Sequence, residues 1–328
     1  MTRRIDKTSV SLRIAIGALC CSLLAAAAAQ AAETAFPVKP IRIVTGQSGG
    51  SPDMVSRVLA QGLAPRLGEQ VIVDNRPTGN IPAELVSHAT PDGYTLLVTS
   101  NVLWIGPLLQ ATPYDPVKDF APVILATRAP NVLVVHPSLP VRSVKELIAI
   151  AKAKPGELNY ASSASGTSSH LAAELFNYMA RVKITRISYK GAGAATADLI
   201  TGQVHLSFFT ATSVMPHVRA GRLRALAVTS REPFSVLPEL PTVAASGLPG
   251  YESSSVYAVF APARTAEAIV TKLNREIAAV LNTQEANARF ANIGAEVAMS
   301  SPQQLAEAMS TETSTMRKVI AAANLRAN

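Results

Sequence analysis

The chain repeats one short pattern: a β-rich run, a loop of small polar residues, and a segment whose apolar residues recur at helical spacing. The clearest copy spans 159–176, where a short strand leads into a Ser/Thr/Gly loop at 162–170 and then into Leu171, Leu175 and Met179. Similar copies lie at 41–63 and 184–200. Strands that alternate with helices are typical of parallel α/β sheets. The pattern therefore predicts an α/β protein.

Further strands are predicted at 71–73, 95–98, 132–135, 204–209, 223–229 and 257–260. Capping boxes at Ser143 and Ser301 predict helix starts, and the chain from Thr265 onward is mostly helical. A chain that runs through α/β segments twice and then returns to a helical tail fits two α/β lobes joined by two hinge crossings. We expect lobe 1 to contain 32–132 and 255–328, and lobe 2 to contain 133–254.

Residues 1–31 have the features of a secretory signal peptide. Basic residues at 3, 4, 7 and 13 precede an uncharged run at 14–29, and a small-x-small pattern follows at 29–31. The apolar run is shorter than the roughly 20 residues that span a bilayer. We expect export and cleavage near Ala31. Because Cys20 and Cys21 both lie in this segment, the mature chain should have no disulfide and no thiolate chemistry.

The formal net charge is +8, but Lys and Arg are scattered and only 5% of residues are aromatic. This favours a general attraction for anions over a nucleic-acid surface. The histidines are isolated from one another and from carboxylate clusters, so no metal site is expected. Gly191-Ala192-Gly193 lacks the third glycine of a dinucleotide fingerprint, and no cofactor is expected.

The loop at 162–170 is suited to holding an anion without a charged side chain. A helix N-terminus presents unpaired N–H groups, and several hydroxyls lie beside it. The alternative is an ordinary connection with Thr167 or Ser168 as the helix cap. His170, in the first helical turn, is expected to be neutral and to support the loop by hydrogen bonding. Lys190 either supplies a cation to the cleft or is simply solvated.

The segment Gly46-Gln47-Ser48-Gly49-Gly50 matches the G-x-S-x-G motif of serine hydrolases. A secreted hydrolase that uses Ser48 is therefore a competing function. Against it, the motif follows the first strand after the signal peptide, so no earlier loop can complete an oxyanion hole. In addition, no later histidine has a recognisable triad context.

Dense short motifs occur throughout the chain after the signal peptide, and they carry a resemblance. They are Pro37-Val38-Lys39-Pro40-Ile41, Asn75-Arg76-Pro77, Pro91-Asp92-Gly93-Tyr94-Thr95, Tyr114-Asp115-Pro116, Pro137-Ser138-Leu139-Pro140, Tyr189-Lys190-Gly191 and Leu248-Pro249-Gly250-Tyr251-Glu252. With these residues the chain resembles the solute-binding proteins of tripartite tricarboxylate transporters, the Bug family.

The resemblance implies a periplasmic binding protein fold that closes over a small organic carboxylate. It also implies a monomer that delivers this anion to membrane transporter subunits and performs no covalent chemistry. A binding protein recruited to ligand sensing, without a transport role, is a further alternative. From the resemblance and the residues together, we expect the ligand-binding residues to be Gln47, Ser48, Gly49, Gly50, Asp53, Thr99, Ser100, Asn101, Arg128, Asn131, Ser162, Ser163, Gly166, Thr167, Ser168, His170, Tyr189, Lys190 and Phe209.

Several departures from the family pattern fall at the predicted cleft. The loop at 45–48 lacks an aromatic residue, the run at 78–82 is short, and Phe209 stands where an aspartate is common. Either Phe209 forms an apolar wall with Phe208, Trp104 and Tyr189, which would favour an organic acid without an amino group, or it packs in the lobe core. The second interpretation is open because side chains alternate along a strand, so only one of Phe208 and Phe209 can face a given side.

Overall fold

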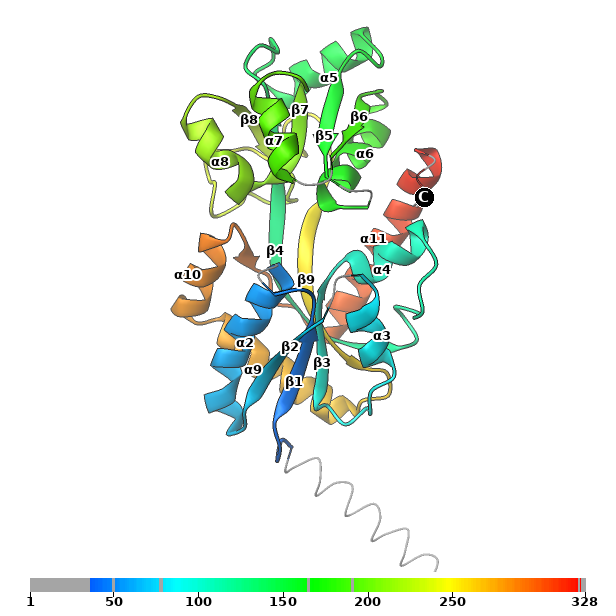
Figure 1. The fold of residues 1–328 in the computed structure, drawn as a ribbon, viewed down its shortest axis with the longest axis vertical. Helices are drawn as coiled ribbons and strands as arrows, with labels where there is room; N and C mark the ends of the chain where they lie inside the picture. Colours follow the sequence, from blue (N-terminus) through cyan, green and yellow to red (C-terminus); the bar gives the residue numbers. More distant parts are fainter. Residues whose placement is uncertain are drawn as a thin grey trace, which may run out of the picture.

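The computed structural model describes residues 36–48, 51–76, 79–163, 166–189, 192–323 and 325. The described chain forms two α/β lobes, and strands β4 (Phe120–Val135) and β9 (Ser254–Pro262) run along the long axis between them (Figure 1). The predicted signal peptide lies outside the described residues, as do the expected site residues Gly49, Gly50 and Lys190. None of the described helices has both the length and the apolar character that a membrane span needs.

The first sheet is built on parallel strands that are covered on both faces. Its order is β2 (Val71–Asn75), β1 (Ile41–Thr45), β3 (Thr95–Ser100), β9 and the first part of β4, and the short β10 (Glu296–Val297) pairs with β4. Strand β1 is parallel to β2 and β3, whereas β9 is antiparallel to β3 and β4. Residues of β1 are buried in near-continuous sequence, as expected for a strand with helices on both sides.

The second sheet uses the last part of β4. There β4 pairs with β7 (Leu206–Thr210) and β8 (Arg224–Val228), while β5 (Asn159–Ser162) lies parallel to β7 and to β6 (Thr185–Ser188). Strand β4 therefore belongs to both sheets: its residues pair with β9 up to Pro130 and with β7 from Asn131.

The return crossing lies at Ser253 and Ser254. The Ser253 amide donates to the carbonyl of Thr229 at the end of β8, and Ser254 already pairs with Pro130 in the first sheet. We propose that these two crossings divide the molecule as expected, into lobe 1 (32–132 with 255–328) and lobe 2 (133–254).

Two cores sandwich the sheet of lobe 1. Helices α2 (Ser51–Leu67), α9 (Glu267–Leu281) and α10 (Gln284–Asn292) contribute to one, and α3 (Ile81–Ser87), α4 (Val102–Leu109) and α11 (Pro302–Ala322) contribute to the other. Along β3, Leu96 and Val98 join the first core, whereas Leu97 joins the second. Helices α2 and α9 approach so closely that a Cβ at Gly62 would lie 2.4 Å from Cγ1 of Val280.

The core on the α11 side continues into lobe 2. There α5 (Val144–Ala153) and α6 (Ser168–Ala180) cover the sheet, and α11 contacts both α4 and α6. Helices α7 (Ala192–Ile200) and α8 (Ala211–Arg219) cover the opposite face with a separate core. Both predicted capping boxes open helices: the Ser143 hydroxyl accepts from the Glu146 amide in α5, and Ser301 with Gln304 forms the complete box of α11.

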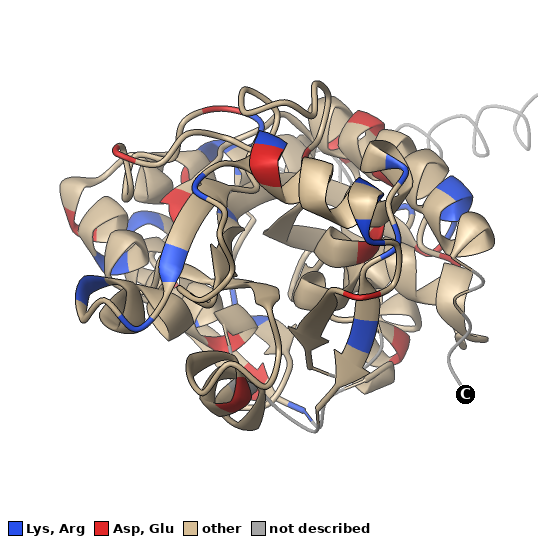
Figure 2. Ribbon diagram, turned by 90° about the horizontal axis from the view of Figure 1, so that it is seen from above, with Lys and Arg blue, Asp and Glu red and all other residues tan. Residues whose placement is uncertain are grey.

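Acidic and basic residues are interspersed along the helices and strands of the ribbon in Figure 2. This distribution matches the scattered charges of the sequence.

Candidate ligand-binding site

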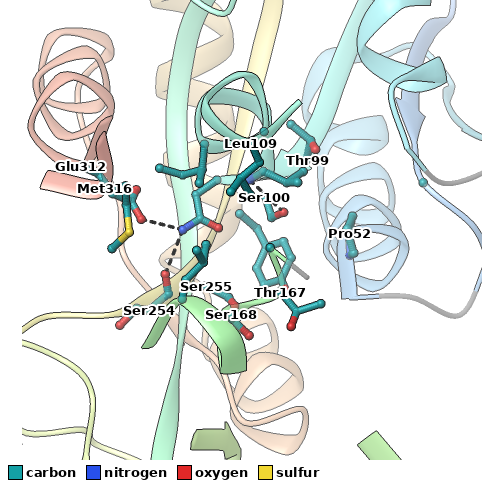
Figure 3. Close-up of a pocket in the computed structure, with 18 of the residues that line it drawn as sticks. Pro52, Thr99, Ser100, Leu109, Thr167, Ser168, Ser254, Ser255, Glu312 and Met316 are labelled. Carbon is teal, nitrogen blue, oxygen red and sulfur yellow. Dashed lines mark hydrogen bonds between the residues drawn. The ribbon is translucent and has the colours of Figure 1, made fainter. Parts of the chain in front are cut away.

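A pocket of about 560 Å³ lies where the loops of both lobes meet near the crossings (Figure 3). Strands β1, β3 and β5 end at this pocket, as ligand sites in open α/β sheets do. Its described lining consists of Gly46, Pro52, Gly79, Pro82, Thr99, Ser100, Asn101, Val102, Ile105, Gly106, Leu109, Gln110, Ser163, Gly166, Thr167, Ser168, Leu171, Ser253, Ser254, Ser255, Tyr257, Glu312 and Met316.

The β5–α6 loop is held together by its own hydroxyl groups. The Oγ of Ser163 lies 3.1 Å from Oγ1 of Thr167 and 3.2 Å from Oγ of Ser169, and the Ser163 amide donates to that same Ser169 oxygen. The Ser168 hydroxyl has no hydrogen bond among the described residues, and Ser168 lines the pocket. The loop thus presents a hydroxyl and a helix N-terminus to the pocket.

His170 supports this loop, as expected from the sequence. It is 2% exposed, and its Nδ1 accepts a hydrogen bond of 3.0 Å from the Gly166 amide. This bond places the proton of the neutral ring on Nε2. Burial, assisted by the positive charge of Arg186, lowers the pKa of His170 to about 4, so the ring is neutral near pH 7.

Arg186, on β6, lies against the same loop, and no pattern in the sequence pointed to it. Its Nε donates to Oγ of Ser162 at 2.8 Å, and its Nη2 donates to the carbonyl of Ser163 at 3.0 Å. The guanidinium thus places a positive charge beside the loop without lining the pocket. A charge so placed adds to the positive potential of the α6 N-terminus.

In lobe 1, Asn101 connects three segments at the edge of the pocket. Its Nδ2 donates to Oε1 of Glu312 at 2.7 Å and to the carbonyl of Ser254 at 3.3 Å. Trp104 donates from Nε1 to the other Glu312 oxygen at 2.8 Å. In Figure 3, the two bonds made by Nδ2 of Asn101 are dashed lines that lead to Glu312 on α11 and to Ser254 at the start of β9.

The structure brings together part of the predicted set. The expected residues that line the pocket are Thr99, Ser100, Asn101, Ser163, Gly166, Thr167 and Ser168. Their role as ligand contacts stays a prediction.

Three predicted residues at the first loop that the structure describes, Gln47, Ser48 and Asp53, lie outside the pocket lining. Gln47 and Ser48 are exposed to solvent. Asp53 is 2% exposed and is ion-paired with Arg57, and it also accepts a hydrogen bond of 2.9 Å from Nδ2 of Asn75. Its position in the first turn of α2 also complements the helix dipole. Asp53 therefore organises the base of the loop, and Pro52 is the residue beside it that reaches the pocket.

Other predicted residues also lie away from the lining. Arg128 pairs through its backbone with β9 and β10, and Asn131 is buried at the crossing, where its backbone bonds with Thr229. The Tyr189 hydroxyl donates to Asp198 at 2.8 Å. Burial, together with that carboxylate, raises the pKa of Tyr189 to about 12.

Phe209 packs in the core of lobe 2, so the interpretation that made it a wall of the pocket is wrong. It is 3% exposed and contacts the α7 and α8 side of the sheet, while Phe208 faces the opposite core. The reason is the alternation of side chains along β7. Trp104 is also buried and does not line the pocket. The absence of an aspartate at position 209 therefore gives no information on whether the ligand has an amino group.

The serine hydrolase alternative gains no support from the geometry. Among the described residues, Ser48 has no hydrogen bond to a histidine, and the buried His170 is bonded to Gly166. Within the same described ranges, no group of three His, Cys, Asp or Glu side chains is arranged to hold a metal ion.

Comparison with known proteins agrees with this architecture. Residues 55–325 match the model of the tripartite tricarboxylate transporter family receptor. The chain belongs to this family. The receptor is 38% identical over 283 residues to protein BugT of Bordetella pertussis, covering 84% of this chain and 87% of BugT.

Solved structures of similar proteins share the two-lobed fold. One is Rpa4515 of R. palustris with adipate, at 38% identity and a TM-score of 0.72, covering 89% of this chain and 99% of that one. Another is MatC of Rhodopseudomonas palustris with bound malate, at 29% identity and a TM-score of 0.67, covering 87% of this chain and 100% of that one.

Proposed function

We propose that this receptor captures a small organic carboxylate in the pocket between its lobes and delivers it to the membrane subunits of a tripartite tricarboxylate transporter. One observation carries the proposal: the N-termini of α2, α4 and α6 reach a single pocket whose described lining contains no Lys, Arg or His. Helix N-termini attract anions through their N–H groups and dipoles.

Two further findings support an anionic ligand. Arg186 adds a positive charge beside the β5–α6 loop, and two structurally similar proteins are described with adipate and with malate. Both of those ligands are carboxylates. We further propose that the receptor works as a monomer in the periplasm after cleavage near Ala31, and that it catalyses no reaction.

A binding assay on the purified mature protein tests this function. Isothermal titration with a panel of mono-, di- and tricarboxylates should identify at least one that binds, and a ligand at 100 times its Kd should stabilise the fold by about 2.7 kcal/mol. Ser168→Ala should weaken binding about tenfold if its hydroxyl donates to the carboxylate. Thr167→Ala should act in the same direction.

Thr201→Ala is the matched control, because Thr201 is exposed at the end of α7 and its hydroxyl bonds only to carbonyls of its own helix. Its affinity should equal that of the wild type. A receptor that binds no carboxylate of the panel would refute the function. Unchanged affinity in Ser168→Ala, Thr167→Ala and the double variant would show that this loop is not the anion site.

A further inference from the structure

Glu312 occupies a position on α11 where the helix pattern calls for an apolar residue. The buried face of α11 contains Leu305, Met309, Met316 and Val319, and Glu312 continues the same spacing. Both Glu312 and Met316 line the pocket, and Figure 3 shows them on the side opposite Pro52. A carboxylate on the buried face of a core helix is costly unless it is well bonded.

The contacts of Glu312 fix its orientation. One carboxylate oxygen accepts from Asn101 at 2.7 Å, and the other accepts from Trp104 at 2.8 Å. Each oxygen can accept a second hydrogen bond. Since Glu312 is a lining residue, this remaining capacity is available to a ligand.

No cation balances Glu312 from the described lining of the pocket. Its hydrogen-bond partners, Asn101 and Trp104, are both neutral, and the carboxylate of Glu252 adds a charge of the same sign. Burial, reinforced by Glu252, raises the pKa of Glu312 against the opposing effect of the two hydrogen bonds. The pocket therefore has a positive side, at the α6 loop with Arg186, and a side that accepts protons or hydrogen bonds, at α11.

We propose that Glu312 determines ligand specificity: it disfavours a second ionised carboxylate on the α11 side of the pocket and accepts a hydrogen bond from a hydroxyl or ammonium group there. The proposal rests on the proposed function. The preferred ligand class is then a monocarboxylate with a distal hydrogen-bond donor, and the lining residues Ile105, Leu109 and Leu171 offer apolar surface to its carbon chain.

Matched pairs of ligands test this specificity by titration calorimetry. Each pair has the same chain length and differs only at the far end: succinate with 4-hydroxybutanoate, glutarate with 5-hydroxypentanoate, and adipate with 6-hydroxyhexanoate. The corresponding amino acids, such as 6-aminohexanoate, separate an ammonium donor from a hydroxyl donor. Within the pair that binds best, the wild type should bind the hydroxy acid about tenfold or more tightly than the diacid, because like charges in a partly buried site repel strongly.

Glu312→Gln removes the charge with almost no change in shape. It should reduce the preference for the hydroxy acid over the diacid by about tenfold, and Glu312→Asp, which keeps the charge, should retain it. Glu307→Gln is the matched control, because it makes the same charge change at an exposed position of α11. The ratio of two affinities measured on one variant does not depend on how much of that variant folds.

Two results would overturn the specificity proposal while leaving the receptor function intact. One is a wild-type protein that binds the diacid of the best pair as tightly as its hydroxy acid. The other is a Glu312→Gln variant whose preference equals that of Glu307→Gln. If the wild type binds none of these compounds and no carboxylate of the wider panel, the receptor function itself fails and the specificity proposal fails with it.

Discussion

A substitution at Gly166 tests how closely the β5–α6 loop packs against α4 of lobe 1. The φ of Gly166 is +78°, and a Cβ added there would lie 2.8 Å from Cδ1 of Leu109 on α4. Gly166→Ala should therefore have two costs. The left-handed backbone conformation costs about 1–2 kcal/mol for a residue with a side chain. Crowding of Leu109 adds up to about 1 kcal/mol, because Cδ1 is the end of a half-buried side chain that can partly turn away.

Gly68 offers a matched control for the first cost. Its φ is +72°, and an added Cβ would meet no atom within 4 Å. Gly68→Ala should lower the free energy of unfolding by the backbone cost alone, about 1–2 kcal/mol. Urea unfolding of both variants gives the difference between their costs, which we expect to be positive and up to about 1 kcal/mol.

A third variant identifies the atoms responsible. In a Leu109→Ala background the crowded methyl group is gone, so Gly166→Ala should cost no more than Gly68→Ala. The reasoning is refuted if the two glycine variants have equal costs in the wild-type background, or if the excess at Gly166 persists after Leu109 is shortened.

Three further predictions concern titration, reactivity and motion. The folded-state pKa of His170 is about 4, below the ordinary 6.5, so the unfolded chain binds a proton at a higher pH than the folded chain does. Between about pH 7 and pH 4, the free energy of unfolding of the wild type should therefore fall by about 3 kcal/mol relative to that of His170→Gln. Urea unfolding of both proteins over this pH range tests the prediction, and an equal pH dependence in the two would contradict it. Ser48 should remain unlabelled by a fluorophosphonate probe, whereas stoichiometric labelling would restore the hydrolase alternative. Saturation with a carboxylate that binds should change the small-angle scattering curve as the lobes close about the β4 and β9 crossings, and superimposable curves would exclude closure.

The sequence predicted part of the pocket lining: the loop at 162–170 stood out by its glycine and hydroxyl residues after a β-rich run, and Thr99, Ser100 and Asn101 came from the family resemblance. The sequence pattern did not predict the full length of β4. The pattern predicted only 132–135, whereas the strand begins at Phe120. Pro122 and Pro130 interrupt the β pattern, and the structure accommodates Pro122 next to a shift in the register with β9.

Two residues that escaped prediction reach the site through tertiary structure: Glu312 lines the pocket, and Arg186 lies beside the β5–α6 loop. Arg186 acts from a neighbouring strand, and Glu312 comes from the last helix, far from any loop motif. A signal for Glu312 did exist, since it interrupts the apolar spacing from Leu305 to Val319. Phe209 shows the opposite limit: a family comparison at one position cannot tell which face of a strand the side chain occupies.

The two crossings also impose an order on how the chain can assemble. In the proposed division, lobe 2 is one continuous segment, whereas β9 of lobe 1 pairs with β3 and β4, which precede that segment in the sequence. Closing a long loop costs more entropy than closing a short one, and a folded insert holds its two ends together. Formation of lobe 2 therefore brings β9 within reach of its partners. During synthesis, the strands of lobe 1 can complete their sheet only after the residues beyond 254 have left the ribosome.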